Sequence, residues 1–303
     1  MRRPNRRLAA TIAALALALA ACGNDDNGDD SAADIPDGPT IDVSSFNFPE
    51  SEILGEIYAQ ALENAGYPVD RTLNLGAREL IYPDLLDGEI SLVPEYLGSA
   101  LVVWFEEDPP SDVDSGLASL REAFEDQGVS VLDPAPAENN QAFVVTTAFA
   151  EENGVSSLGD LADAGDLTFA GPPECEPRDT CYQGLVDTYG LDNVAFETIQ
   201  EAAARLAALE AGDVEMILLF STDAPLAGDE LVVLEETEGM LPPENITPVV
   251  RTEVVDAYGD DLTSLLDEVT AAITTDALQQ MNAEASEGRS AAEIASDWLD
   301  ENV

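Results

Sequence analysis

Two cysteines and one arginine form the most distinctive chemical group in this sequence. Cys175 and Cys181 bound most of the segment PECEPRDTC at residues 173–181, and Arg178 lies between them. Two thiols at this spacing could bind a metal ion, act as a redox pair or form a structural disulfide. A metal site would need two further soft ligands, and the chain contains no histidine. The spacing also differs from the CxxC of redox motifs, so we expect a structural disulfide if the chain is exported.

The third cysteine, Cys22, ends a segment that is typical of an export signal. Residues 1–21 carry four arginines near the start, then an apolar run of about a dozen residues that is too short for a confident membrane span. The sequence LAAC at residues 19–22 resembles a bacterial lipobox, in which the cysteine is lipid-modified and begins the mature protein. We predict a signal peptide at 1–21, a lipidated Cys22 and a flexible acidic tether over 22–39. An ordinary signal peptide with an incidental cysteine is the alternative; lipidation of Cys22 leaves the inner cysteines as an even pair.

The composition excludes several classes of function. The chain has 303 residues and a formal net charge of −51, and all eleven basic residues are arginines. So few cations cannot form a nucleic-acid-binding face. The lack of histidine excludes Ser-His-Asp triads and Cys-His dyads, and no Walker loop or GxSxG elbow is present. We therefore expect no catalytic site, no cofactor and no metal.

The acidity is spread along the chain, which bears on where the protein works. Repulsion between so many carboxylates is tolerable where salt screens it. We interpret the composition as that of an acidic halophilic protein. The alternative is a lineage with acidic proteins and no special salinity.

Short β-like runs alternate with amphipathic helical patterns from Thr40 onward. After the leader and the tether, about 260 residues remain, which suits one large domain or two lobes. The alternation predicts an α/β fold with mostly parallel sheets. The expected strands are 40–46, 69–75, 89–96, 129–133, 142–147, 166–171, 194–199, 214–220, 231–236 and 246–251, and the expected helices include 50–66, 77–88, 115–128, 158–164, 181–190, 201–212, 262–273, 275–286 and 290–302.

Four segments, in order, resemble the glycine betaine/carnitine/choline-binding lipoproteins of ABC importers. They are SFNFPESEILGEIYAQALENAGYPV, LGARELIYPDLLDGEISLVPEYLGSAL, PECEPRDTCYQGLVDTYGL and VVLEETEGMLPPENITPVVR. The resemblance implies an α/β, two-lobed periplasmic-binding-protein-like (type II) fold with two crossover hinge segments. It places the first lobe at 40–140 plus 245–303 and the second at 141–244, with the ligand in the cleft between them.

The family's site has four tyrosines that cage a quaternary ammonium, and an arginine and a lysine that bind its anionic end. By resemblance, Tyr96 takes one cage position and Phe220 replaces another tyrosine. Ser99 replaces a threonine, Asn140 matches a polar cleft residue, and Arg178 matches the carboxylate-binding arginine.

Three positions depart from the family pattern. Ala142 stands where a cage tyrosine is usual, with Phe143 beside it as a substitute ring. Glu244 stands where the last tyrosine is usual and could face a cation by charge. Phe46 stands where the lysine is usual. The ligand could therefore be glycine betaine, choline, a carnitine-like molecule or another cationic osmolyte.

The resemblance predicts a binding protein, not an enzyme. We expect a monomer, exported and anchored by lipid to the outer face of the cell membrane, that delivers a quaternary ammonium solute to separate permease and ATPase subunits. The alternatives are a solute-sensing or structural envelope lipoprotein on the same fold, or an importer component for a different small solute. Neighbouring permease and ATPase genes would favour the transport hypothesis.

Overall fold

The computed structural model describes residues 38–76, 78–106 and 109–303. These residues belong to one compact unit, Ala33–Val303. The predicted signal peptide, Cys22 and nearly all of the predicted tether lie outside the described residues. Within the described residues, no helix combines the length and apolarity that crossing a membrane requires.

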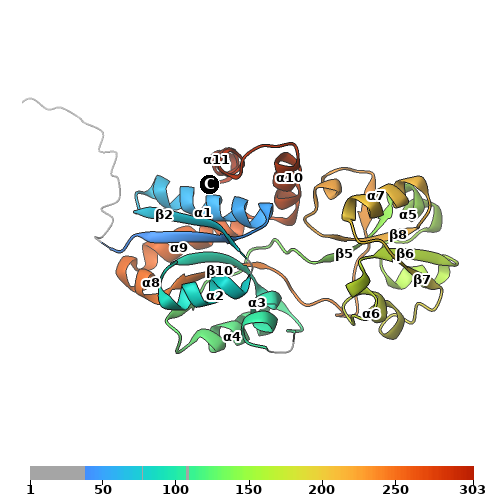
Figure 1. Cartoon of the computed structure of the whole chain (residues 1–303), viewed down its shortest axis with the longest axis horizontal. Coiled ribbons are helices and arrows are strands. Elements are labelled where there is room, and N and C mark those ends of the chain that lie inside the picture. The colour runs from blue at the N-terminus through green and yellow to red at the C-terminus, as the bar shows by residue number, and fades with distance from the viewer. Residues whose placement is uncertain (1–37, 77, 107–108) are drawn as a thin grey trace, which may run out of the picture. The chain divides into compact units, whose positions relative to one another are not determined.

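Ten strands form two separate five-stranded sheets (Figure 1). The first sheet has the order β2-β1-β3-β10-β4, and the second β7-β6-β8-β5-β9. We call the first sheet with its helices the first lobe, and the second sheet with its helices the second lobe. The strands are β1 Ile41–Phe46, β2 Val69–Gly76, β3 Leu92–Tyr96, β4 Val129–Val131, β5 Gln141–Thr146, β6 Leu167–Gly171, β7 Val194–Thr198, β8 Met216–Phe220, β9 Leu231–Val233 and β10 Ile246–Arg251.

Both sheets are mixed but, as predicted, mostly parallel: four strands of each sheet run in one direction and one strand runs in the opposite direction. In the first lobe, β1 pairs in parallel with β2 and β3, whereas β10 is antiparallel to β3 and β4. In the second lobe, β6 is parallel to β7 and β8, whereas β5 is antiparallel to β8 and β9. Parallel neighbours need a long crossover connection, usually through a helix. Strands β5 and β10 instead arrive directly from the other lobe, and each enters its sheet in the opposite direction.

Helices cover the two sheets unequally. The first-lobe helices are α1 Pro49–Ala65, α2 Arg78–Asp87, α3 Leu97–Trp104, α4 Val113–Phe124, α8 Thr252–Tyr258, α9 Asp260–Ala272, α10 Thr275–Ser286 and α11 Ala291–Asn302, and those of the second lobe are α5 Thr147–Asn153, α6 Tyr182–Asp187 and α7 Ala202–Ala211. Three short 3₁₀ turns, Gly159–Asp163, Pro173–Cys175 and Ala224–Ala227, complete the second lobe. The predicted helix at 158–164 is one of these turns.

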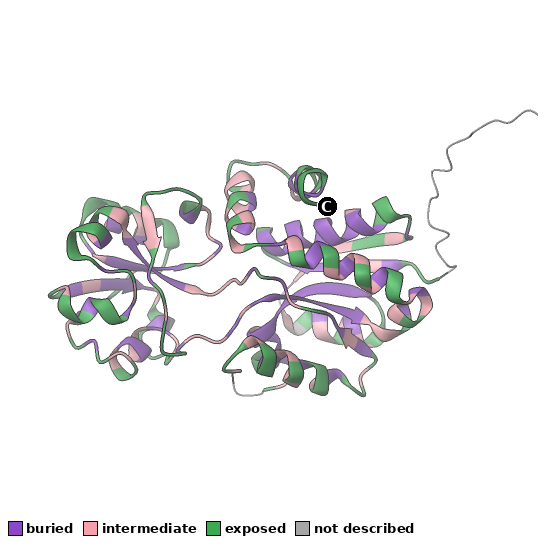
Figure 2. Cartoon of the chain, turned by 180° about the vertical axis from the view of Figure 1, so that it is seen from behind, coloured by how far each residue is buried: buried purple, intermediate pink, exposed green. Residues whose placement is uncertain are grey.

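Strand β5 shows how the second lobe builds its core. Phe143 and Val145 belong to one buried cluster, and Ala142 and Val144 belong to another. Successive side chains of a strand point to opposite faces of the sheet, so apolar residues at consecutive positions supply both faces. The three central strands β5, β6 and β8 are accordingly buried along most of their length, whereas the edge strands β7 and β9 are not (Figure 2).

The two segments that connect the lobes run side by side. Glu138 and Asn245 form an antiparallel bridge, and the Asn139 N–H donates to the Glu244 carbonyl at 3.0 Å. The Asn140 side chain donates to the carbonyl of Pro242 at 2.7 Å. No helix or strand crosses the predicted boundaries at 140/141 and 244/245, and these boundaries stay predictions.

Candidate functional site

A large cleft is lined by residues of both lobes and of the connecting segments. Its volume is about 1140 Å³, slightly above the range of about 300–1,000 Å³ that is usual for small-molecule pockets. Side chains that matter for its chemistry are Phe48, Glu50, Arg78, Tyr96, Ser99, Val102, Val103, Asn139, Asn140, Gln141, Arg178, Thr180, Arg205, Phe220, Asp223, Glu244 and Asn282. Polar and apolar groups therefore converge on one site.

The cleft exposes apolar side chains that a folded protein usually buries. Phe48 is 36% exposed, Val102 40%, Val103 41% and Phe220 49%, and all four line the cleft. Exposed apolar groups gathered in one hollow indicate a surface that is covered when a ligand binds.

Six of the eight predicted ligand-binding residues line this cleft, namely Tyr96, Ser99, Asn140, Arg178, Phe220 and Glu244. Segments far apart in the sequence bring them together. Tyr96 ends β3, Ser99 lies in the first turn of α3, and Phe220 ends β8.

Phe143 is one of the two predicted site residues that do not line the cleft. Its ring is 1% exposed, and it packs against Phe169 at a centroid distance of 5.4 Å. It therefore belongs to the core of the second lobe and does not replace the ring missing at Ala142. The cause is the strand alternation of β5, which directs Phe143 to the face covered by the larger cluster.

Phe46 lies beneath the cleft and supports its wall. The ring is 2% exposed and stacks on Phe48 at 5.9 Å. The guanidinium carbon of Arg78 lies 4.7 Å from the centroid of the same ring, a cation–π contact. Phe46 therefore places an aromatic ring where the family usually has a lysine. Arg78, at the start of α2, supplies a cation beside this ring.

Arg78 is itself held by a buried carboxylate. Its guanidinium donates to Glu95 at 2.5 and 2.9 Å, and Glu95 is fully buried. This two-point pair neutralises most of the charge that Arg78 brings. No motif in the sequence around Arg78 marks it as a site residue, so it was not among the predicted residues.

Arg178 differs from the other arginines in the described residues. Its exposed side chain makes no hydrogen bond or ion pair there. Five of the other arginines form ion pairs, and Arg205 donates to the carbonyls of Leu218, Ile199 and Gln200. In so acidic a protein, an arginine that lines the cleft without a carboxylate partner is available for an anionic ligand group.

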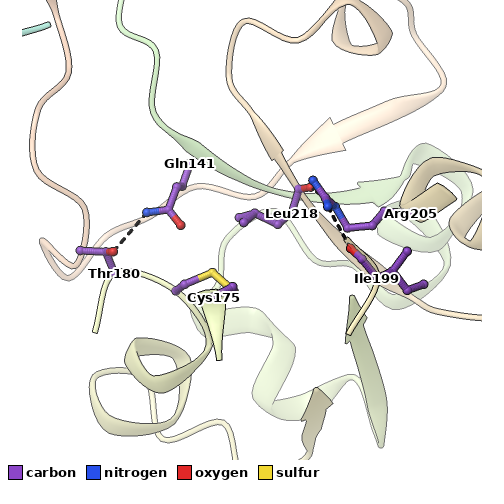
Figure 3. The surroundings of a disulfide bond; sticks show 7 residues. Gln141, Cys175, Thr180, Ile199, Arg205 and Leu218 are labelled. Atoms are coloured by element: carbon purple, nitrogen blue, oxygen red, sulfur yellow. Dashed lines mark hydrogen bonds between the residues drawn. A yellow bond between two sulfur atoms is a disulfide. The ribbon is translucent and has the colours of Figure 1, made fainter. Parts of the chain in front are cut away.

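The predicted disulfide is present and forms the base of the Arg178 loop. Cys175 and Cys181 are bonded with a Cα–Cα distance of 5.3 Å, and both are buried. The loop closes through backbone bonds as well: Arg178 N–H donates to the Cys175 carbonyl, and Cys181 N–H donates to the Arg178 carbonyl. Figure 3 shows Gln141 on β5 donating to Thr180 of this loop, at 3.1 Å. The loop is thereby fixed to the strand that enters from the first lobe.

A second buried carboxylate, Glu50, organises the wall opposite this loop. Tyr96 Oη donates to Glu50 at 2.7 Å, Asn139 at 2.8 Å and Asn282 at 2.7 Å. Asn282 on α10 also donates to the Thr222 carbonyl of the second lobe at 2.8 Å. Burial, followed by the nearby Glu50 charge, raises the pKa of Tyr96 well above its usual value, so the phenol stays neutral. Glu50 lies within the first of the four family-like segments and Asn139 precedes Asn140, but no motif marks either residue as part of a site.

Glu244 is the half-buried carboxylate of this wall. Its two oxygens accept hydrogen bonds from the Ser99 N–H and the Ser99 hydroxyl, both at 3.0 Å. Burial raises the pKa of Glu244 to about 7, because the bonds from Ser99 and the charge of Arg78 offset only part of the desolvation. Glu244 therefore changes its charge near neutral pH.

The cleft is electrically polar. The wall on the first-lobe side carries Glu50 and, from the connecting segment, Glu244, which is bonded to α3; the second-lobe wall carries Arg178 and Arg205. Asp223 also lies on the second-lobe side, and burial raises its pKa. This arrangement suits a small ligand with a cationic and an anionic end.

Comparisons with known proteins identify the family of this chain and its relatives. The family described as the substrate binding domain of ABC-type glycine betaine transport system matches residues 39–301. A glycine-betaine-binding protein of Pseudomonas aeruginosa is 29% identical over 283 residues, covering 89% of this chain and 90% of that protein. The glycine betaine-binding protein YehZ of Escherichia coli is 27% identical over 273 residues, covering 86% of this chain and 89% of that protein.

The solved structure of apo YehZ superposes on this chain with a TM-score of 0.77 and 27% sequence identity. The alignment covers 86% of this chain and 98% of the YehZ chain. This agreement confirms the predicted two-lobed periplasmic-binding-protein fold of type II. The protein belongs to the family of substrate-binding domains of ABC-type glycine betaine transport systems.

Proposed function

We propose that the protein captures a zwitterionic quaternary ammonium solute of the glycine betaine type and delivers it to an ABC permease. One observation carries the proposal: Arg178 lines the cleft and has no carboxylate partner among the described residues. The ligand's carboxylate binds this guanidinium through two charge-assisted hydrogen bonds.

The ligand's methylated cation binds the opposite wall. A quaternary ammonium cannot donate hydrogen bonds from nitrogen, so aromatic faces and carboxylate charge must hold it. The ring centroids of Phe48 and Tyr96 lie 5.9 Å apart on this wall. Phe220, at the end of β8, also lines the cleft. Each ring in contact with the cation contributes about 0.5–2 kcal/mol, depending on desolvation.

The cellular setting is part of the same proposal. We propose that lipid on Cys22 anchors the chain to the outer face of the cell membrane, and that it works as a monomer with separate permease and ATPase chains. The lipobox-like residues 19–22 and the family membership support this setting. Family membership also supports transport in preference to catalysis.

Calorimetric titration of the mature protein in high salt tests the ligand. We expect glycine betaine to bind, choline and carnitine to bind with different affinities, and unrelated amino acids and sugars to give no heat. Binding of an unrelated solute, with no heat from any quaternary amine, would overturn the proposal and favour an importer component for another solute. Loss of solute uptake when the gene is deleted would separate transport from sensing.

A further inference from the structure

The carboxylate of Glu244 stands at the start of a helix and at the wall of the cleft. Ser99 is in the first turn of α3, and its N–H and hydroxyl each donate to one oxygen of Glu244. Gly98 lets the carboxylate approach, since a Cβ at Gly98 would lie 3.2 Å from Glu244 Oε1 and 2.8 Å from the Pro243 carbonyl. The start of α3 therefore fixes the position of the Glu244 carboxylate.

These bonds leave acceptor capacity on both oxygens. A carboxylate has about four lone-pair sites, and Ser99 uses two of them. No arginine donates to Glu244 among the described residues, because the nearest cation, Arg78, is already bound to Glu95. Glu244 can therefore attract a cation in the cleft as well as bind α3.

The charges around Glu244 come from several elements. Arg78 on α2 favours its ionised form, and Glu95 on β3 opposes it. Glu50, Asp223, Arg178 and Arg205 line the same cleft. Because Arg78 is paired with Glu95, the carboxylates Glu50 and Glu244 on this side of the cleft have no ion-pair partner among the described residues, and a bound cation relieves the repulsion between them.

We propose that the ionised carboxylate of Glu244 binds the ligand's cationic group, and that its protonation weakens ligand binding. The inference rests on the proposed function and deepens it, because it names the group that replaces an aromatic ring at the cation end of the site. The two hydrogen bonds from Ser99 hold the Glu244 carboxylate in position, and they do not neutralise its charge.

The first consequence is proton-linked affinity. In the free protein the pKa of Glu244 is raised to about 7, and a bound cation lowers it. Binding must therefore release a proton from the protein below neutral pH, and affinity falls by up to about tenfold for each pH unit below 7. Above pH 8 the affinity becomes independent of pH.

The second consequence concerns ligand choice. An aromatic face attracts a methylated cation without accepting a strong hydrogen bond, whereas a carboxylate also accepts one from an ammonium N–H. Zwitterions with a tertiary ammonium, such as N,N-dimethylglycine, should therefore bind about as tightly as glycine betaine.

Calorimetry with glycine betaine and N,N-dimethylglycine between pH 5.5 and 8.5 tests the inference, using the mature protein and two variants. Glu244→Gln keeps an acceptor for Ser99 but loses the charge. Glu244→Tyr restores the ring that is usual in the family. Glu236→Gln is the matched control, because Glu236 is a partly buried acceptor from Tyr189 and does not line the cleft.

The wild type and Glu236→Gln should show the pH dependence, and the observed enthalpy at pH 6.5 should vary with the ionisation enthalpy of the buffer. Glu244→Gln should lose about tenfold or more in affinity at pH 8 and bind independently of pH. Glu244→Tyr should also lose the pH dependence and should favour glycine betaine over N,N-dimethylglycine.

Three results would overturn the inference while leaving the proposed function intact. They are wild-type binding of glycine betaine that does not change with pH, a pH dependence that persists in Glu244→Gln, and unchanged affinity in that variant at pH 8. The last result would assign Glu244 to capping α3 alone. Absence of binding by any quaternary amine would instead contradict the proposed function.

Discussion

Single residues decide the charge of each wall of the cleft. Arg178 is the cation of the second-lobe wall that no described side chain neutralises, and Glu244 is the carboxylate of the first-lobe wall that titrates near neutrality. Arg78, by contrast, is already paired with Glu95. Substitutions at these two positions should therefore affect the ligand more than substitutions at the paired residues.

Replacing Arg178 by alanine should weaken glycine betaine binding by about 10- to 100-fold, the value of a charge-assisted hydrogen bond. Choline has no carboxylate, so its affinity should change little. Titration calorimetry measures both, with Arg121→Ala as the control, since Arg121 is exposed on α4 and pairs with Asp133. Equal losses for the two ligands would count against an anion-binding role.

Glu244 should also make stability depend on pH in the absence of ligand. Its pKa is raised to about 7 in the folded state from a usual 4.5, so between these values the folded state binds the proton more tightly than the unfolded state does. Stability should fall as pH rises through this window, by an amount on the order of 2 kcal/mol. Urea unfolding at pH 5 and pH 8 should show that Glu244→Gln removes this difference, and an unchanged difference would show that other groups cause it.

At the scale of elements, the disulfide-bounded loop and helix α6 act as one unit. Gly184 lies in α6, where a Cβ would lie only 1.9 Å from the Asp179 carbonyl. Only glycine lets the helix pack this closely under the loop. The disulfide, the loop backbone bonds and this contact together hold Arg178 at the cleft.

Replacing both Cys175 and Cys181 by alanine should destabilise the protein by about 2 kcal/mol from chain entropy alone, because the closed loop is short. Both sulfurs are buried, so lost packing adds to this cost. Affinity for glycine betaine should fall more than affinity for choline, because Arg178 becomes less well positioned. Thermal unfolding and calorimetry, with reductant added to the wild type as a parallel, provide the measurements; an unchanged ligand preference would show that the loop does not need the bond.

At the scale of the whole molecule, the net charge of −51 opposes folding through self-repulsion. The chain has 62 acidic residues and only 11 arginines, so ion pairs can neutralise only a small part of the acidic charge. Salt at 1 M reduces the screening length to about 3 Å, against about 10 Å at 0.1 M. The protein's stability should therefore depend on ionic strength more than that of a neutral protein does.

The Tm should rise by about 10 °C between 0.1 and 2 M NaCl as repulsion is screened. Calorimetric scans of the ligand-free protein test this, with sucrose of equal osmolality as the uncharged control. A rise of the same size in sucrose would assign the effect to solute exclusion, and no rise in salt would contradict the halophilic interpretation.

The sequence by itself determined the class of fold and the family, and six of the residues that it nominated for the site line the cleft. Periodicity showed alternating strands and helices, and four ordered segments indicated the family. The spacing of the cysteines and the lack of histidine favoured the disulfide that the structure contains. Local patterns carry this information because each depends on residues that are neighbours in the chain.

Only the tertiary structure decided which side chains meet. Strand β5 has apolar residues on both faces, so its pattern could not tell that Phe143 faces the core and does not supply the ring missing at Ala142. Both mixed sheets depend on the direction in which β5 and β10 enter, which no local pattern encodes. Glu244 contacts Ser99, which lies 145 positions away in the sequence. Its pKa is raised by burial, and this burial exists only when the connecting segments have folded against the first lobe.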